Sequence, residues 1–239
     1  MKRMKTQRRG KGSPRYTASS NSVGKIRYSF NYTQKTVKGE VVDILHNVGK
    51  SAPLAKIVLE TNQAFYVPAG EGFYVGLKIN AGAGSDLSLG SIMPIGEVKP
   101  GTPIYNIESI PGDGGSFFRA GGSFGEVITS DESGVYIKMK SGVKRKIDPK
   151  SLCTIGIVSN GGRTIKPFYK AGNKHHAMKA KGGRIYPRVR GYAMNAVDHP
   201  HGGSGHNSPG RQKPVSKKFG APGQKAGFIG AKQTGRKKK

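Results

Sequence analysis

The segment "GVYIKMKSGVKRKI", residues 134–147, contains two runs in which apolar and polar side chains alternate around a Ser-Gly link. A period of two places alternate side chains on opposite faces of a strand, and two such runs joined by a short glycine-containing link are typical of a β-hairpin. We expect one face to be buried and the other, mainly cationic face to point outward, although these lysines also fit a strand face that is simply solvated. The expected inner face carries Val135, Ile137, Met139, Val143 and Ile147, and the expected outer face Lys138, Lys140, Lys144 and Lys146.

Short β-rich runs continue on both sides of this hairpin, with turn residues between them. "TNQA" (61–64) predicts a tight turn, and residues 86–98 are expected to hold at most one helical turn. Many short strands with frequent Gly and Pro favour small barrels, and "KPGTP" (99–103) predicts a break between two consecutive barrels rather than one sandwich. The other predicted strands are 39–46, 54–60, 64–69, 76–82, 102–109, 125–131 and 153–159.

The charge of the chain is unevenly distributed. In 239 residues, 41 Lys and Arg face 13 Asp and Glu, a formal charge of +28. Residues 1–35 hold ten basic residues and no acidic one, residues 36–160 hold twelve of each, and residues 161–239 hold nineteen basic residues and only Asp198. Such an excess attracts polyanions, above all nucleic acid.

Apolar content follows the same divisions. Leu, Ile, Val and Phe make up 37 of the 125 residues in 36–160 but only 9 of the 79 in 161–239, where Gly and Pro number 21. A segment so poor in apolar surface cannot offset the entropy of ordering itself, so we expect it to be extended or disordered until a partner orders it. The predicted organisation is a basic N-terminal extension (1–35), a first barrel (36–98), a second barrel (99–160) and a basic Gly/Pro-rich C-terminal extension (161–239).

Other classes of protein are disfavoured. An anionic membrane surface is an alternative polyanion, but no apolar run approaches the roughly 18 residues of a spanning helix. The Arg-rich start has some likeness to an organellar transit peptide but lacks regular apolar spacing. Cys153 is the only cysteine, which excludes an internal disulfide and fits a reducing cytosol.

Two glycine-containing stretches suggest phosphate contact. Gly49-Lys50-Ser51 resembles part of a phosphate-binding loop, but Ile44 occupies the position of its first glycine and Pro53 disfavours the helix that must follow. The loop "PGDGGSFFRAGG" (111–122) offers glycine backbone beside Arg119, which predicts RNA contact; a long flexible connection is the alternative.

The stretch "NAVDHPHGGSGH" (195–206) concentrates histidines, one aspartate and glycines. These side chains can bind zinc or transfer protons, which leaves a metal-dependent hydrolase acting on RNA, centred on Asp198, His199 and His201, as an alternative function. A DNA-compacting architectural protein is another. Within an almost acid-free arm, contact with folded RNA explains more of the stretch, because glycines permit close backbone approach and imidazoles donate to phosphate or stack.

Longer stretches resemble a known family. "GRTIKPFYKAGNKHHAMKAKG" (162–182) and "PRVRGYAMNAVDHPHGG" (187–203) closely resemble the universal L2 family of large-subunit ribosomal proteins. "SAPLAKI" (51–57), "NIESIPGDGGSFFRAGG" (106–122) and "APGQKAGFIGAKQTGR" (221–236) are similar to the same family, so the resemblance covers nearly the whole chain. "AGNKHH" and the length are typical of the archaeal and eukaryotic branch, and we favour an archaeal source.

The resemblance implies a mainly β protein: an OB-fold barrel followed by an SH3-like barrel, with extended basic N- and C-terminal arms threaded into RNA. It implies a non-catalytic, cytoplasmic constituent of the large subunit that supports subunit association, tRNA binding and assembly of the peptidyl-transferase region. The implied partners are large-subunit rRNA, neighbouring ribosomal proteins, small-subunit rRNA at an intersubunit bridge and, indirectly, tRNA, with no membrane. No cofactor is required, although Mg²⁺ or K⁺ could bridge the protein to rRNA.

By position, His199 matches a family histidine long discussed for peptide-bond formation; that chemistry is assigned to RNA, so we give His199 a structural and RNA-contacting role. His206 is not carried over, because relatives differ after the paired glycines. The predicted RNA-binding residues are Arg8, Arg9, Arg15, Arg119, Arg163, Lys166, Lys170, Lys174, His175, His176, Lys179, Lys181, Arg184, Arg188, Arg190, Asn195, Asp198, His199, His201, Gly202, Gly203, Arg211, Lys225 and Arg236.

Overall fold

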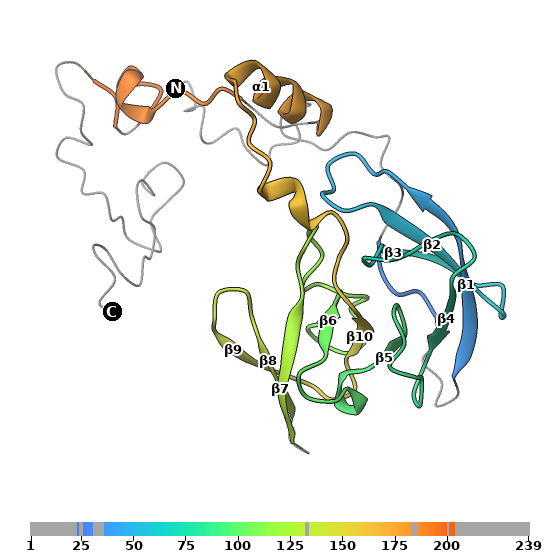
Figure 1. Ribbon diagram of the computed structural model, residues 1–239. Helices are drawn as coiled ribbons and strands as arrows, with labels where there is room; N and C mark the ends of the chain where they lie inside the picture. Colours follow the sequence, from blue (N-terminus) through green and yellow to red (C-terminus); the bar gives the residue numbers. More distant parts are fainter. Residues whose placement is uncertain are drawn as a thin grey trace. The chain divides into compact units, whose positions relative to one another are not determined.

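The computed structural model describes residues 23, 26–30, 36–131, 134–182, 186–199 and 201–203. The chain forms two units, one of residues Ser20–Tyr169 and one of Met1–Ser19 with Lys170–Lys239. The first unit contains every strand found in the described residues (Figure 1). The mainly β fold expected from the sequence is confirmed, while the OB and SH3-like assignments and the boundary between two barrels stay predictions.

One continuous sheet runs through the first unit. Its ten strands follow the order β3-β2-β1-β4-β5-β10-β6-β7-β8-β9. Every pairing is antiparallel except the one between β4 and β5. The strands are β1 (Val37–Leu45), β2 (Leu54–Leu59), β3 (Ala64–Pro68), β4 (Lys78–Ala81), β5 (Ile92–Pro94), β6 (Pro103–Tyr105), β7 (Gly125–Asp131), β8 (Gly134–Lys138), β9 (Lys144–Ile147) and β10 (Leu152–Ile155).

The hairpin predicted at 134–147 is confirmed as β8 and β9, with Val135 opposite Ile147 and Lys138 opposite Lys144. Val135, Ile137 and Ile147 are buried. The expected burial of Val143 is wrong, because this side chain is 62% exposed. Met139 N–H donates to the Val143 carbonyl, and Gly142 N–H donates to the Met139 carbonyl, so Val143 belongs to the turn rather than to the strand.

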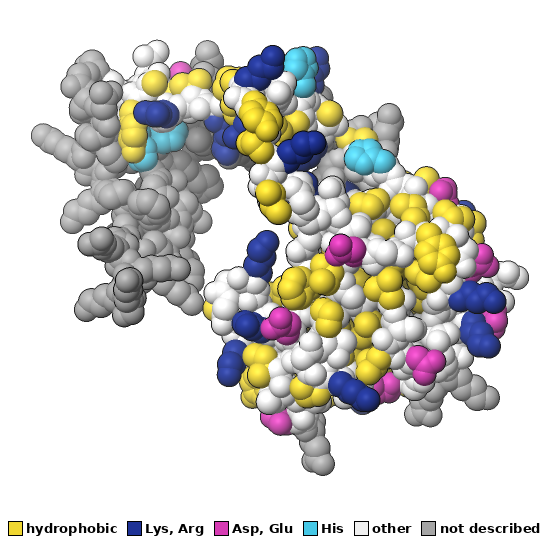
Figure 2. Space-filling model, in the orientation of Figure 1, with side chains coloured by type: hydrophobic (Ala, Val, Ile, Leu, Met, Phe, Trp, Pro, Cys, Tyr) yellow, Lys and Arg dark blue, Asp and Glu magenta, His cyan; other side chains and the backbone are white. Residues whose placement is uncertain are grey.

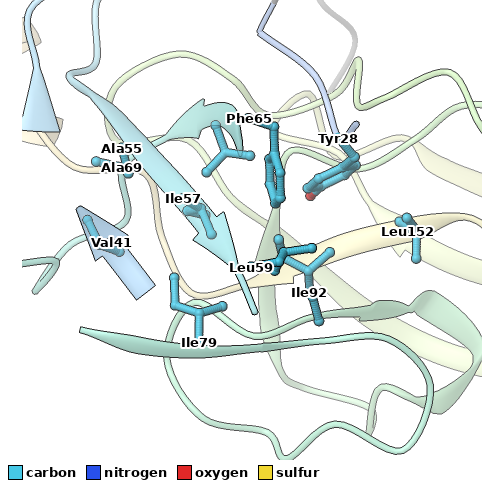
Figure 3. Close-up of a cluster of buried hydrophobic side chains, with 12 residues drawn as sticks. Tyr28, Val41, Ala55, Ile57, Leu59, Phe65, Ala69, Ile79, Ile92 and Leu152 are labelled. Carbon is cyan, nitrogen blue, oxygen red and sulfur yellow. The ribbon is translucent and has the colours of Figure 1, made fainter. Parts of the chain in front are cut away.

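Two large hydrophobic cores lie along the sheet, beside a smaller cluster of Ala52, Tyr105 and Val158. The first gathers side chains from β1 to β4, including Phe65 of β3, together with Tyr28 (Figure 3). The second includes Val127 from β7, Val135 and Ile137 from β8, and Ile147 from β9.

Strands β5 and β10 contribute side chains to both cores. Ile92 and Leu152 belong to the first core, and the next residues, Met93 and Cys153, belong to the second. Consecutive side chains on a strand point to opposite faces, so these central strands are buried on both sides.

The N-terminal segment contributes to the first core. Tyr28 is buried, its hydroxyl donates to the Asn106 carbonyl at 2.9 Å, and it therefore accepts from Thr154 Oγ1 at 2.5 Å. Burial raises the pKa of the Tyr28 hydroxyl well above its ordinary value, so the group stays protonated as the donor. This contact anchors the end of the predicted basic extension on the β unit.

Most predicted strands are confirmed, and the differences are local. The expected strand at 153–159 begins at Leu152 and ends at Ile155, and the one at 102–109 is reduced to β6. The single turn expected within 86–98 is the 3-10 helix Ile95–Glu97, but strand β5 just before it was not predicted. The "TNQA" turn is confirmed: Asn62 has a positive φ of 60° and donates its N–H to the Leu59 carbonyl.

The second unit holds α1 (Ala171–Ala180) and a 3-10 turn, η4 (Gly191–Ala193). The sequence predicted a C-terminal arm that is extended or disordered until a partner orders it; the extended form is wrong for residues 171–180, which are helical, and ordering by a partner stays a prediction. This stretch lacks Pro and β-branched residues and contains three Ala, two Lys and one Met, which favour a helix. No helix in the described part of the chain is long and apolar enough to cross a bilayer.

Candidate nucleic-acid interface

Helix α1 presents basic side chains without a buried face. None of its ten residues is buried, its first turn contains no acidic residue, and Lys179 lies in its last turn. A helix without a separate apolar face gains little from packing within its own chain. Its predicted RNA-contacting residues are therefore accessible to a partner: Lys174, His175, His176 and Lys179, followed by the C-cap Lys181.

Cation–aromatic contacts accompany this helix. Lys174 Nζ lies 5.1 Å from the centroid of the Tyr186 ring, a distance that fits a cation–π interaction. Figure 2 shows Lys, Arg and His side chains gathered over α1. Combining cations with aromatic planes suits RNA, because phosphates attract the charge while unpaired bases stack on rings.

A compact loop follows at residues 190–203. After η4, the Asn195 carbonyl accepts hydrogen bonds from the N–H groups of Asp198 (2.9 Å) and His199 (3.3 Å). The loop then folds back, with Gly202 N–H donating to the His199 carbonyl at 2.8 Å and Gly203 N–H donating to the Met194 carbonyl at 3.2 Å. The described residues of the stretch that the sequence singled out, 195–199 and 201–203, thus form a turn held by backbone hydrogen bonds.

The glycines of this loop have two different roles. A Cβ added at Gly202 would lie 2.3 Å from the Asn195 carbonyl oxygen, so only glycine fits this internal crossing. A Cβ at Gly203 would meet nothing within 4 Å, and its φ of 134° lies in a region that side chains disfavour. The close backbone approach predicted for these glycines is internal at Gly202, whereas Gly203 faces open space.

The two histidines of the loop contact one another. His201 N–H donates to His199 Nδ1 at 3.0 Å, and the two ring centroids are 4.8 Å apart. An Nδ1 that accepts a hydrogen bond carries no proton, so a neutral His199 holds its proton on Nε2 and offers a donor there. Partial burial and the proximity of His201 lower the pKa of His199, which favours this neutral form.

His201 is the more enclosed of the pair. Its ring is stacked on Tyr192, with 5.2 Å between centroids and 23° between planes, and only 9% of the residue is exposed. Its Nε2 has no hydrogen-bond partner among the described residues. A buried polar nitrogen without a partner costs free energy, so this atom is an unsatisfied group within the loop.

Asp198, His199 and His201 belong to this loop, but the described residues contain no group of three His, Cys, Asp or Glu side chains arranged to hold a metal ion. Asp198 is partly buried and has an interaction of its own. The His199 ring accepts a hydrogen bond from the His201 backbone N–H and lies against the His201 ring.

Arg119 in the glycine-rich loop also contacts protein backbone. Its guanidinium donates to the Gly115 carbonyl at 2.9 Å and to the Ile26 carbonyl, and burial lowers its pKa. Glu108, which sequence reasoning did not single out, orders the same loop: its buried carboxylate accepts from the N–H groups of Gly112, Gly114 and Leu152. The sequence could not identify Glu108, because no residue pattern shows that its carboxylate is buried and accepts backbone hydrogen bonds. RNA contact by Arg119 stays a prediction.

Some of the other predicted basic residues lie among the described residues, and the rest do not. Arg163, in the 3-10 helix η3 (Gly161–Thr164), and Lys166, Lys170, Arg188 and Arg190 are exposed. The following predicted residues lie outside the described residues: Arg8, Arg9, Arg15, Arg184, Arg211, Lys225 and Arg236, together with His206.

Comparison with known proteins finds one family, whose members match nearly the whole chain. The family described as "Ribosomal Proteins L2, C-terminal domain" matches residues 88–219. A protein of Methanocaldococcus jannaschii named "Large ribosomal subunit protein uL2" is 45% identical over 99% of both chains. Proteins of the same name from Methanococcus vannielii and Natronomonas pharaonis are 43% and 44% identical, covering 99% and 98% of this chain and 99% and 96% of their own.

Proposed function

Because the chain belongs to the L2 family of large-subunit ribosomal proteins, we propose that it binds large-subunit rRNA directly through α1 and the 190–203 loop. The relatives compared with it are archaeal, and the chain is a structural constituent of the large subunit in the cytoplasm. The observation that carries this proposal is helix α1, which has no buried residue and presents basic side chains. Phosphate contacts supply most of the affinity of such an interface.

The loop adds fitted contacts to this electrostatic attraction. Neutral His199 donates from Nε2 to a phosphate or a base oxygen, and His201 Nε2 takes a partner from the RNA. Arg188 and Arg190 flank the loop and are exposed, in position to neutralise phosphates beside it. The role of the loop is to position RNA, which agrees with a non-enzymatic protein.

We further propose that this contact supports assembly of the peptidyl-transferase region, tRNA binding and association with the small subunit. A rigid, internally bonded loop held against rRNA fixes the path of the RNA around it. Mg²⁺ or K⁺ bridging between carboxylate or carbonyl groups and phosphates would reinforce the contact, and no cofactor is needed for it.

The test is rebinding of the purified chain to large subunits from which this protein has been washed with salt. We expect stoichiometric co-sedimentation with large but not small subunits in moderate salt, and little competition by excess duplex DNA. The double variant Arg188→Ala/Arg190→Ala should rebind more weakly, whereas Lys38→Ala/Lys78→Ala, on β1 and β4, should rebind normally. Equal binding to duplex DNA would favour a DNA-compacting protein instead.

A further inference from the structure

A pocket lies beside the turn that joins β8 to β9, away from α1 and the 190–203 loop along the chain. Its volume is about 270 Å³, near the roughly 300 Å³ at the lower end of small-molecule sites. A space of this size admits one planar ring system rather than a folded segment. The pocket is lined by Gly122, Phe124, Glu126, Lys138, Met139, Lys140 and Gly142.

Phe124 makes one wall of this pocket apolar and aromatic. The residue precedes β7 and is 38% exposed, and Met139, partly buried, lines the same space. Neither belongs to a strand, so both side chains are held by the loop and the turn that flank the sheet. An accessible aromatic ring offers a stacking surface to any base, because every base has a π-face.

The charges around the pocket are predominantly positive. Glu126 Oε2 lies 3.5 Å from Lys138 Nζ, so these two groups neutralise one another. Lys140 has no carboxylate partner among the described residues, and Lys144 lies directly across from Lys138 on β9. Figure 2 shows further Lys and Arg side chains over the β8–β9 hairpin. The pocket therefore combines an apolar wall with a surplus of cations, which matches a nucleotide better than an apolar side chain.

We propose that this pocket binds a single unpaired nucleotide of rRNA, with its base stacked on Phe124 beside Met139 and its phosphate neutralised by Lys140. Glu126 accepts a hydrogen bond from an amino group of the base, as acidic side chains do from cytosine N4. The amino group is present on adenine, cytosine and guanine and absent from uracil. This inference rests on the proposed rRNA binding and assigns it a second, separate site.

The test is ultraviolet crosslinking of intact large subunits that contain this chain, followed by nuclease and trypsin digestion and mass spectrometry. We expect a nucleotide of A, C or G on the tryptic peptide 120–138, localised by fragmentation to Phe124. Phe124→Leu should lower the yield at least roughly fivefold, the lower end of what an aromatic stacking contact contributes. Val143→Ala, at another exposed apolar residue of the same hairpin, should leave the yield unchanged.

Three results would overturn the assignment: an unmodified Phe124 peptide, a crosslink from it to another protein, or equal loss of yield in both variants. An attached uridine would refute the role given to Glu126. Crosslinks on peptides from residues 186–203 provide the internal comparison. If those carry nucleotides and the Phe124 peptide does not, the proposed rRNA binding holds and the pocket fails; if neither does, both fail.

Discussion

At the residue scale, the protonation of His199 controls the hydrogen bond that closes the 190–203 loop. The acceptor is Nδ1, and the donor is the His201 backbone N–H at 3.0 Å. Protonating Nδ1 destroys the acceptor and places a cation beside the His201 ring. The loop is therefore more stable when His199 is neutral.

We expect the loop to loosen as the pH falls from 7.5 to 5.5. The folded pKa of His199 is lowered below the unfolded value of about 6.5, so the unfolded loop binds the proton more readily. The contribution of His199 to loop stability is present above the unfolded pKa and lost as the pH falls through the folded pKa. Amide exchange at His201, corrected for the intrinsic pH dependence of exchange, measures this loss.

His199→Asn supplies the control, because an amide oxygen accepts a hydrogen bond without titrating in this range. Exchange at His201 in that variant should show no loss of protection between pH 7.5 and 5.5. A His199 titration midpoint at or above 6.5, read from its ring proton resonances, would contradict the assigned hydrogen bond.

At the scale of elements, α1 lacks the features that keep a short helix stable without a partner. Its ten residues fall below the roughly 12–15 that an isolated helix needs in water, and none of them is buried. The first turn includes Gly172, which costs about 1 kcal/mol relative to Ala in a helix interior, and the N-cap Lys170 makes no side-chain capping bond.

Amide exchange should therefore distinguish the free chain from the assembled subunit at α1. We expect rapid exchange over 171–180 in the free chain and strong protection in the large subunit, while Val135 and Ile137 in β8 are protected in both. Gly172→Ala should raise the protection of α1 in the free chain without changing β8. Strong protection of α1 in the free, unmodified chain would show that the helix needs no partner.

The same elements show what a sequence can predict. The β8–β9 hairpin was predictable because alternation is a local signal, and both partners are near in the chain. Strand β5 was not, because its apolar run "IMP" lacks a period and its pairing with β10 joins residues far apart in the chain, such as Met93 and Cys153. The residues of the 190–203 loop were predictable as a site, but the His199–His201 bond depends on a backbone turn around Asn195 that composition does not encode. Phe124 carried no signal, because one aromatic residue before a strand is unremarkable until the fold leaves it exposed.

At the scale of the whole molecule, the charge is divided between segments with different roles. Residues 36–98 carry six acidic and four basic side chains, whereas residues 161–239 carry nineteen basic residues and one acidic residue. On the sheet, Lys78 is opposite Glu40 and Lys56 is opposite Asp43, so lysines there have acidic neighbours across the strands. The lysines of α1 have no acidic residue within the helix, since its sequence contains none.

This division predicts which lysines set the salt dependence of rRNA binding. Each phosphate neutralised contributes roughly −0.7 to −0.9 to the slope of log K against log salt, so replacing cations that contact phosphate makes the slope shallower. Lys174→Gln/Lys179→Gln/Lys181→Gln should reduce the magnitude of the slope by about 2 to 3 if all three contact RNA. Filter binding to large-subunit rRNA between 50 and 200 mM KCl measures this slope.

A matched triple variant removes the same charge from the β unit: Lys38→Gln/Lys56→Gln/Lys78→Gln, on β1, β2 and β4. It lowers the net charge by the same amount as the α1 variant, so a purely long-range field would weaken binding equally in both. We expect its slope to stay within about 0.5 of the parent chain, less than one phosphate contact. Equal slopes in the two variants would mean that the +28 charge acts as a diffuse attraction, and the assignment of direct phosphate contacts to α1 would then fail.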